Sequence, residues 1–417
     1  MSEWKRYKLS DLYEMSSGIS STKEQSGHGS PFLSFSVVIN NYFLPDSLID
    51  LMDTTDGDKQ KYSINEGDIF LTRTSETVDE LAMSSVALKD YPEASFSGFL
   101  KRLRPVDKRI VYPKFMAFYL RSPLFRRTII NNTVMTLRAS FNEAMFSYLE
   151  IMLPDFDTQK KIGDFLYSLE KKKQTNNQIN QELEAMAKSL YDYWFVQFDF
   201  PDQNGKPYKS SGGKMVYHPE LKREIPEGWG VAKLNEVVDL ISGYPFSSND
   251  YVTSGKYKLY TIKNVQDGYT VDKVDNYLDF LPSNMSHECQ LRRGDLIMSL
   301  TGNVGRVGMV YEDDVLLNQR VLKLNPINKT HKSFIYSFFR SDVTKAHLEN
   351  MSTGTSQKNL SPIDIGNMMI PFPSESLLSK FLDNLNMLEN NLVENQQLTK
   401  LRDWLLPMLM NGQVKVE

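Results

Sequence analysis

The chain has 417 residues and a formal net charge of −4, with 24% of its residues charged. This length accommodates two or three domains, each able to bury a core, and the overall charge gives no sign of a nucleic-acid partner. Cys289 is the single cysteine, which excludes a disulfide framework and suits a reducing compartment. The N-terminal segment lacks an apolar signal core, and no run approaches the roughly 20 apolar residues of a membrane span. We therefore expect a soluble, intracellular protein without a membrane partner.

The second half of the chain repeats the first. The segment that begins at Trp4 returns 225 residues later from Trp229, and "GDIFLTR" at Gly67–Arg73 returns 227 residues later as "GDLIMSL" at Gly294–Leu300. The Pro-containing segments "LEIMLP" and "MMIPFP", near the end of each copy, correspond at a shift of 219. A period of this size indicates a duplicated domain rather than a stacked solenoid repeat. We predict a pseudo-two-fold molecule with two similar sites, which suits a two-part target.

Both copies have the pattern of α+β domains, which we assign to residues 1–158 and 229–373. In the first copy, short apolar runs punctuated by Gly, Pro, Asn and Asp predict strands at Ile69–Leu71, Ser85–Leu88 and Phe99–Leu103, followed by a helix at Pro113–Arg121. The second copy has corresponding runs, and we predict strands at Lys258–Ile262, Leu296–Leu300, Val307–Val310 and Val321–Leu324, and a helix at Ser333–Phe339.

Each copy leads into a segment whose apolar period is about 3.5 residues, which predicts long helices within residues 159–197 and 374–417. Between the first helix and the second copy, residues 198–228 are rich in Pro and Gly and indicate an extended connector. The heptad spacing predicts a coiled-coil seam formed by Ile162, Leu166, Leu169, Asn176, Ile179, Leu183, Met186, Leu190, Phe381, Leu385, Leu388, Leu392 and Asn395.

Two seam positions carry asparagine. Asn176 and Asn395 are separated by 219 residues and therefore occupy the same position of the repeat. One interpretation is that the heptads simply tolerate a polar residue. The other is that the two amides meet each other or other polar groups and set the register and orientation of the helices.

The chain lacks the common catalytic and cofactor motifs. "GNVGRVG" at Gly302–Gly308 lies between two strand-like runs, so hairpin glycines are the preferred interpretation over a phosphate cradle. No P-loop, no "NPPY"-like methyltransferase loop and no histidine set with metal-ligand spacing occurs. Two PD…ExK-like patterns, from Pro154 and from Pro201, place their acids on a helix and in the connector, where they cannot converge on one ion. We predict no catalytic, cofactor or metal site.

Local charge does favour DNA binding. Between Lys101 and Arg138, basic residues, mostly arginines, accompany the single acid Asp107, and arginine suits bidentate contacts to phosphate or guanine. A solvated basic face that balances the acidic stretch Asp50–Asp58 is the alternative. The polar turns "TLRAS" and "GTSQKN" occupy equivalent positions in the two copies. The candidate DNA-binding residues are Arg73, Arg102, Arg104, Arg126, Arg127, Arg138, Lys263, Asn303, Arg306, Arg320, Gln357 and Lys358.

The repeated Trp-to-Gly segments, the two "GD" strands, the connector "FDFPDQNGKPYKSSGGKMV" and the terminal "LRDWLLPMLMNGQV" resemble specificity subunits of type I restriction–modification systems. The resemblance covers essentially the whole chain. It implies two target-recognition domains, two helices in an antiparallel coiled coil, and a cytoplasmic, nucleoid-associated protein. It further implies assembly on double-stranded DNA with two methyltransferase subunits, which use S-adenosylmethionine, and with motor-nuclease subunits, which use ATP and Mg. The two copies differ in one respect, because Gln159 of the first copy corresponds to Leu378 of the second. We therefore expect the starts of the two helices to dock differently.

We therefore predict a non-catalytic subunit in which each domain reads one half of an asymmetric, interrupted DNA sequence and the helices set the spacer. Two other classes stay open. A single-chain restriction–methylation enzyme is disfavoured by the missing methyltransferase motifs, and a pure assembly scaffold would not read sequence.

Overall fold

The computed structural model describes residues 4–20, 22–75, 80–132, 139–354, 358–381 and 383–416. The chain forms two compact units. Unit 1 comprises Met1–Lys172 together with Leu398–Glu417, and unit 2 comprises Lys173–Gln397. The last part of the chain is thus grouped with the first domain, a division that differs from the boundaries drawn along the sequence.

Unit 1 is built around an antiparallel four-stranded sheet in the order β2-β9-β5-β7. A separate antiparallel pair joins β1 to β11, and β3 lies between β4 and β8. The strands of unit 1 are β1 (Lys5–Lys8), β2 (Tyr13–Ser17), β3 (Ser26–Leu33), β4 (Leu51–Met52), β5 (Ile69–Thr72), β6 (Thr74–Ser75), β7 (Ser84–Val86), β8 (Ser95–Phe96), β9 (Leu100–Pro105), β10 (Ala139–Ser140) and β11 (Glu150–Leu153). Its short helices are α1 (Leu9–Leu12), α2 (Phe35–Asn40), α3 (Asp56–Lys61), α4 (Pro113–Tyr119), α5 (Pro123–Asn131) and α6 (Glu143–Tyr148).

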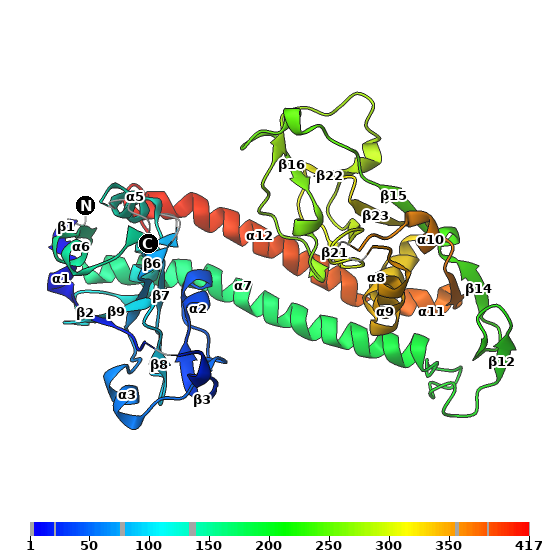
Figure 1. Cartoon of the computed structure of the whole chain (residues 1–417), viewed down its shortest axis with the longest axis horizontal. Coiled ribbons are helices and arrows are strands. Elements are labelled where there is room, and N and C mark those ends of the chain that lie inside the picture. The colour runs from blue at the N-terminus through cyan, green and yellow to red at the C-terminus, as the bar shows by residue number, and fades with distance from the viewer. Residues whose placement is uncertain are drawn as a thin grey trace. The chain divides into compact units, whose positions relative to one another are not determined.

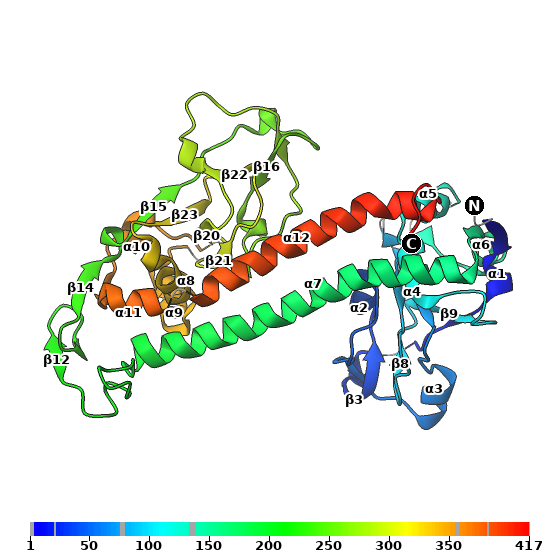
Figure 2. The ribbon, with the colours of Figure 1, turned by 180° about the vertical axis from the view of Figure 1, so that it is seen from behind.

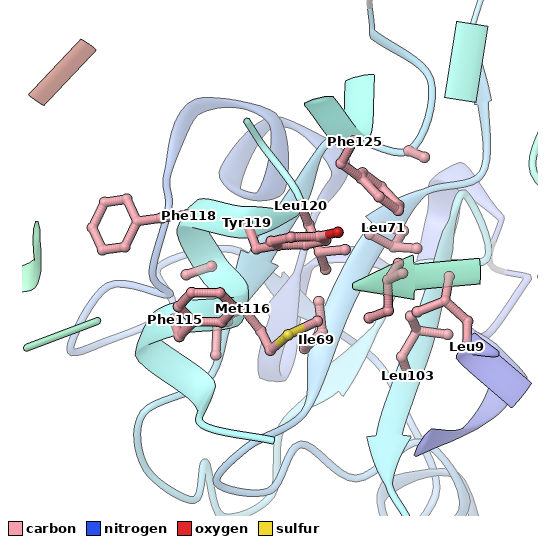
Figure 3. Close-up of a cluster of buried hydrophobic side chains, with 14 of the residues drawn as sticks. Leu9, Ile69, Leu71, Leu103, Phe115, Met116, Phe118, Tyr119, Leu120 and Phe125 are labelled. Carbon is pink, nitrogen blue, oxygen red and sulfur yellow. The ribbon is translucent and has the colours of Figure 1, made fainter. Parts of the chain in front are cut away.

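The central strand β5 is buried on both faces, which explains its unbroken apolar run. Ile69 and Leu71 join the core beneath α4, whereas Phe70 joins a second core on the opposite face. Pro113 occupies the first turn of α4, as predicted, where its missing N–H leaves no intrahelical bond unmade. Figure 3 shows Met116 of α4 beside Ile69 of β5 in this core. The sheet and α4 thus form the scaffold from which the loops of unit 1 project.

Unit 2 has a five-stranded sheet in the order β15-β23-β20-β21-β17, a four-stranded sheet in the order β18-β16-β22-β19, and the antiparallel pair β14-β24. Its strands are β12 (Met215–His218), β13 (Arg223–Pro226), β14 (Gly230–Lys233), β15 (Val238–Ser242), β16 (Tyr257–Tyr260), β17 (Gly268–Tyr269), β18 (Tyr277–Leu278), β19 (Gln290–Leu291), β20 (Leu296–Ser299), β21 (Val307–Met309), β22 (Val315–Leu317), β23 (Val321–Pro326) and β24 (Met369–Phe372). Its short helices are α8 (Lys332–Arg340), α9 (Asp342–Met351), α10 (Pro362–Gly366) and α11 (Glu375–Lys380).

The two units share one topology. The order β2-β9-β5-β7 in unit 1 matches β15-β23-β20-β21 in unit 2, and the pair β1-β11 matches β14-β24. Gly18 and Gly243 have the same role, because a Cβ on either would lie within 2.5 Å of a carbonyl oxygen, that of Ser97 or of Asn318. The predicted duplication and the predicted mixed α/β class are confirmed.

Two long helices contribute residues to both units. Helix α7 runs from Phe156 to Tyr191 and continues into a π-helical turn over Asp192–Val196, and α12 runs from Asp383 to Met410. Within each unit a stretch of α7 lies beside a stretch of α12 (Figures 1 and 2). In unit 2 the helices are antiparallel, because Asn176 pairs with Asn395 while Asn180, further along α7, pairs with the earlier Asn391. No helix among the described residues has the length and apolar character needed to cross a membrane.

Most predicted seam residues are buried in one of the two units. Two are not: Ile179 is 38% exposed and Met186 is 58% exposed. The inward positions are instead Asn180 and, partly, Ala187. Asn180 and Ala187 keep the alternating spacing of four and three residues that runs from Ile162 to Leu190, whereas Ile179 and Met186 each lie one residue before the heptad position. The prediction that Ile179 and Met186 belong to the seam is therefore wrong. The buried or partly buried seam residues are Ile162, Leu166, Leu169, Asn176, Leu183, Leu190, Phe381, Leu385, Leu388, Leu392 and Asn395.

The connector is more structured than its composition suggested. Strands β12 and β13 form an antiparallel hairpin. The rings of Phe198 and Phe200 each lie 5.3 Å, centroid to centroid, from the ring of Trp229. Proline and glycine fall mainly at the turns and strand ends, so the segment folds back on unit 2 instead of remaining extended throughout.

The two helix starts dock differently, as the departure at Gln159 predicts. Gln159 is buried, accepts a hydrogen bond from the Tyr112 backbone N–H at 3.0 Å and donates to the carbonyls of Ile110 and Pro154. Leu378 is fully buried in the apolar core of unit 2. One start is therefore held by hydrogen bonds to loop backbone and the other by apolar packing.

Candidate nucleic-acid interface

Three segments that are distant in sequence lie side by side in unit 2. The Leu300 N–H donates to the Arg320 carbonyl at 3.0 Å, and the Leu360 N–H donates to the Leu300 carbonyl at 2.9 Å. A further bond joins the Gly302 N–H to the Lys358 carbonyl. The end of β20, the turn before β23 and the loop before α10 thus form one continuous surface, which we call the reading face of unit 2.

Unit 1 has the same arrangement. The Arg73 N–H donates to the Phe99 carbonyl at 2.8 Å, and the Phe141 N–H donates to the Arg73 carbonyl at 2.8 Å. Strands β6 and β10 pair beside these bonds, with Ser140 opposite Thr74. The end of β5, the turn before β9 and the loop before α6 therefore form the reading face of unit 1. Of the two polar turns that the sequence placed at equivalent positions, residues 136–138 and 355–357 lie outside the described residues.

A groove of about 670 Å³ crosses the reading face of unit 2. Three predicted DNA-binding residues, Asn303, Arg306 and Lys358, line it. The β20–β21 hairpin carries the first two, and the Gly302 and Gly305 that shape its loop have φ values of +72° and +76°. The expectation that these glycines serve a hairpin is confirmed.

The hairpin loop is held in place by its own hydrogen bonds. The Ser299 hydroxyl donates to the Asn303 carbonyl and accepts from the Arg306 N–H at 3.2 Å. The Arg306 guanidinium donates to the Gln266 amide oxygen at 3.3 Å, and the Lys358 ammonium lies 3.7 Å from a Glu349 carboxylate oxygen. The groove thus carries amide, guanidinium and ammonium donors beside the carboxylates of Asp267 and Glu349. These groups suit contacts to base edges and phosphates.

Arg102 and Arg104 lie elsewhere, in β9, and their guanidinium groups make contacts within unit 1. Arg102 is buried and donates to the Ser63 carbonyl at 2.7 Å. Arg104 donates twice to Asp68, whose side chain is fully buried, at 2.8 and 2.6 Å. Burial lowers the pKa of Arg102, whereas the hydrogen bond to Asp68 raises the pKa of Arg104. Both guanidinium groups thus have partners within unit 1, which favours a structural role over the predicted contact with DNA.

The remaining candidates are dispersed. Arg126 donates to the Leu81 carbonyl, and Arg127 is exposed on α5. Lys263 forms an exposed ion pair with Asp275 at 2.7 Å and does not line the groove. Arg320 is exposed at the turn before β23. Arg138 and Gln357 lie outside the described residues.

Three residues on the reading faces were missed by the sequence analysis. Gln266 and Tyr269 line the groove of unit 2, and Phe99, which is 65% exposed, lies at the reading face of unit 1. Charge and glycine signals do not identify an amide or an aromatic residue, and each of the three is brought to its face by strand pairing. One signal was available for Phe99: it corresponds in the repeat to Arg320, which was itself a candidate DNA-binding residue.

A partly buried charge cluster fixes α7 to the domain of unit 2. Glu184 of α7 accepts hydrogen bonds from the Tyr336 hydroxyl and the Arg340 guanidinium of α8. Arg340 also donates to Asp267 at 3.0 Å, which in turn pairs with Lys345 at 2.7 Å. Burial lowers the pKa of Arg340 to about 10, so it remains charged at neutral pH. Asp267 lines the groove, and the cluster therefore connects the reading face to the helix within this unit.

Among the described residues no group of three or more His, Cys, Asp or Glu side chains is arranged to hold a metal ion. A duplicated face rich in hydrogen-bond donors, carried on rigid strands, suits recognition of an extended polar polymer.

The family model of the type I restriction modification DNA specificity domain matches residues 1–185 and 226–401, and the chain belongs to this family. The HindI specificity subunit of Haemophilus influenzae is 24% identical, over 99% of this chain and 100% of that protein. The MjaIX specificity subunit of Methanocaldococcus jannaschii is 27% identical, over 64% of this chain and 61% of that protein. The crystal structure of the type I S subunit from M. genitalium has a TM-score of 0.54 at 15% identity, covering 98% and 96% of the two chains, and supports the fold.

The predicted family is thus confirmed. The chain is the DNA specificity subunit of a type I restriction–modification system and has two target-recognition domains. It is not itself the enzyme, since the methylation and cleavage activities of such a system reside in other subunits.

Proposed function

We propose that each reading face recognises one half of an asymmetric, interrupted sequence in double-stranded DNA. The observation that carries this proposal is the recurrence of the same three-segment face in each unit with different side chains. Unit 2 presents Asn303, Arg306 and Lys358, whereas unit 1 presents Arg73 and Phe99. The same backbone arrangement carrying different side chains suits two half-sites of different sequence. We expect the protein to act in the cytoplasm, on the DNA of the nucleoid.

Domain replacement tests this proposal. Residues 229–373 are exchanged for the second domain of another family member, and methylated adenines are mapped across host DNA. We expect one half-site to change while the other half and the spacer are kept. The reciprocal exchange of residues 1–158 is the matched control and should alter only the opposite half. Alteration of both halves by one exchange would contradict independent reading.

We further propose that α7 and α12 set the number of base pairs between the half-sites. Both helices contribute residues to both units, and a helix of 36 residues measures about 54 Å at 1.5 Å per residue. The charge cluster at Glu184 supports this role, because it ties the domain of unit 2 to one position along α7.

The proposed partners include two methyltransferase subunits, which supply S-adenosylmethionine chemistry, and motor-nuclease subunits, which use ATP and Mg. Exposed apolar side chains on both long helices suit docking of two copies of one partner. On α7 and its π-helical extension these are Ile179, Met186 and Tyr193, spaced seven residues apart. A depression lined by Met186, Leu190 and Tyr193 lies on this surface. On α12 the exposed apolar residues include Met387, Leu401 and Trp404, and the repeat equivalent of Trp404 is Ala185, the neighbour of Met186.

Charge substitution tests the docking proposal. Met186→Glu and Trp404→Glu are each expected to remove one methyltransferase subunit, since burial of a carboxylate in an apolar interface is costly. Subunit stoichiometry is measured by native mass spectrometry of the assembled complex. Ile363→Glu, at an exposed apolar residue of α10, is the control and should leave the stoichiometry unchanged. Full stoichiometry in both helix variants would place the docking surface elsewhere.

Two alternatives are separated by simple measurements. A single-chain enzyme predicts that this chain alone binds S-adenosylmethionine, which calorimetry on the purified chain would detect. A scaffold that does not read sequence predicts that both domain exchanges leave the methylated sequence unchanged.

A further inference from the structure

One turn on the reading face is constructed identically in the two units. The turn precedes β9 in unit 1, over Ser97–Leu100, and β23 in unit 2, over Asn318–Val321. The Leu100 N–H donates to the Ser97 carbonyl at 2.9 Å, and the Val321 N–H donates to the Asn318 carbonyl at 2.9 Å. Each turn is therefore closed by the same bond. We call the two segments the reading turns.

Matched bonds also hold the reading turns against the residues that follow β2 and β15. The Gly98 N–H donates to the Ile19 carbonyl at 2.7 Å, and the Gln319 N–H donates to the Tyr244 carbonyl at 3.1 Å. At the preceding residue, Gly18 and Gly243 approach the Ser97 and Asn318 carbonyls more closely than any side chain permits. Such contacts leave the turn little freedom to move.

The tip residue of each turn is anchored in the same way as its counterpart. The Phe99 N–H donates to the Ser97 hydroxyl at 3.2 Å, and the Arg320 N–H donates to the Asn318 amide oxygen at 3.3 Å. The carbonyl of each tip residue accepts from the end of the central strand, from Arg73 in unit 1 and from Leu300 in unit 2. Phe99 and Arg320 thus occupy corresponding structural positions in the two units, although one side chain is aromatic and apolar and the other is cationic.

Both tip side chains are exposed beside other reading-face residues. Phe99 is 65% exposed, and the Arg73 guanidinium reaches the Gly98 carbonyl of the same turn at 3.4 Å. A single exposed apolar residue is common on protein surfaces. What distinguishes Phe99 is its rigid support and its matched counterpart. An arginine suits the O6 and N7 edge of guanine, whereas a phenylalanine suits a thymine methyl group or a partly unstacked base step.

We propose that Phe99 and Arg320 are the corresponding specificity-determining residues of the two reading faces. Phe99 contacts an apolar base feature in one half-site, and Arg320 contacts a guanine edge or the adjoining phosphate in the other. The proposal rests on the function proposed above, because it assumes that each face reads one half-site. It adds that the difference between the half-sites originates partly from this one position.

The test uses the full chain in complex with its methyltransferase subunits. The variants are Phe99→Arg, Phe99→Ala, Arg320→Phe and Arg320→Ala, and methylated adenines are mapped in host DNA carrying each complex. We expect the Phe99 variants to change base preference at one position of one half-site, and the Arg320 variants to do so in the other half, with the spacer kept. Loss of Arg320 should reduce discrimination about tenfold at that position.

Ile49→Arg and Ile49→Ala are the matched controls, because Ile49 is an exposed apolar residue of unit 1 that is 85% exposed and lies outside the reading turn. Both should leave the methylated sequence unchanged. Binding to duplexes with each base at each half-site position provides a second readout for any variant that methylates poorly. Unchanged base preference in both Phe99 variants and both Arg320 variants, beside a bipartite wild-type site, would overturn this inference alone. A wild-type complex without a bipartite site would overturn the proposed function instead.

Discussion

Asn176 donates a hydrogen bond from its side-chain nitrogen to the Asn395 side-chain oxygen at 3.0 Å, and these two residues occupy the same position of the repeat. The same Asn176 nitrogen reaches Glu394 at 2.6 Å, and Asn395 donates to Asn177 at 2.7 Å. The second interpretation of the paired asparagines, that they meet, is therefore confirmed. Their effect on helix register stays a prediction.

Removal of one asparagine should destabilise the helix pair. Asn176 is fully buried, so Asn176→Ala removes its hydrogen bonds to Asn395 and Glu394 from the helix interface and should cost about 1–3 kcal/mol. The double variant Asn176→Leu/Asn395→Leu restores apolar packing and should recover thermal stability while it loses specification of register. Thermal unfolding of the complex measures the first effect, and cysteine cross-linking across the helices measures register. Equal stability of wild type and Asn176→Ala would contradict a contribution of this network to stability.

Arg104 should contribute to stability rather than to DNA affinity. Arg104→Ala leaves the fully buried Asp68 carboxylate without its guanidinium, and we expect a loss of about 3 kcal/mol in the free energy of unfolding. Arg109→Ala is the matched control, because Arg109 also forms a forked ion pair, with Asp107, but is 90% exposed. The control should show no measurable change. Chemical denaturation compares the two variants, and equal stabilities would refute the structural role.

Arg306 and Lys358 should control the salt dependence of DNA binding. Each lines the groove, and loss of one phosphate contact lowers the slope of log affinity against log salt by about one. Arg306→Ala and Lys358→Ala should therefore each flatten this slope in titrations of the complex. Arg293→Ala, which removes an ion pair with Asp313 outside the groove, is the control. A slope that is unchanged in both groove variants would remove these residues from the phosphate contacts.

Acid should weaken the docking of α7 onto its domain in unit 1. Burial acts to raise the pKa of Asp164, but hydrogen bonds from Lys114, Lys160 and Tyr112 outweigh it and hold the pKa below its ordinary value. A depressed carboxyl pKa stabilises the fold above the unfolded value, near pH 4, and this stability is lost as the pH falls through the folded value. Asp164→Asn should lower stability at pH 7 and reduce the further loss on acidification. Thermal unfolding from pH 7 to pH 3 measures both effects, and parallel curves would contradict the assignment.

Lengthening both helices should lengthen the spacer. Four residues inserted after Asn177 and four after its repeat equivalent, Gln396, add about 6 Å, or roughly two base-pair rises of 3.4 Å. Inserting four residues at both equivalent positions lengthens the two helices by the same amount. We expect a spacer longer by one or two base pairs with both half-sites kept, as read by methylation mapping. An active complex with the original spacer would mean that the helices do not set the distance.

The sequence by itself determined the duplication, the mixed α/β class, the long helices and the family, because each depends on local or repeated patterns. Ile69, Phe70 and Leu71 alternate between two cores as a central strand requires, and their counterparts around Ile297 do the same. The close backbone contacts at Gly18 and Gly243 recur in both copies for the same steric reason, because a side chain at either position would clash with a carbonyl oxygen. Such patterns can be recognised in the sequence without knowing which distant residues are in contact.

Only the tertiary structure decided which polar residues remain available for DNA. Arg104 meets the buried Asp68, 36 residues away, and no local pattern separates this paired, partly buried guanidinium from the exposed one of Arg320. The seam keeps its heptad spacing by placing the polar Asn180 inward instead of the apolar Ile179, and Asn180 is paired there with Asn391, 211 residues away in the sequence. Phe99 and Arg320 became comparable only once strand pairing placed them on equivalent turns. A side chain's partners are set by chain segments far apart in sequence, and the reading faces are built from three such segments.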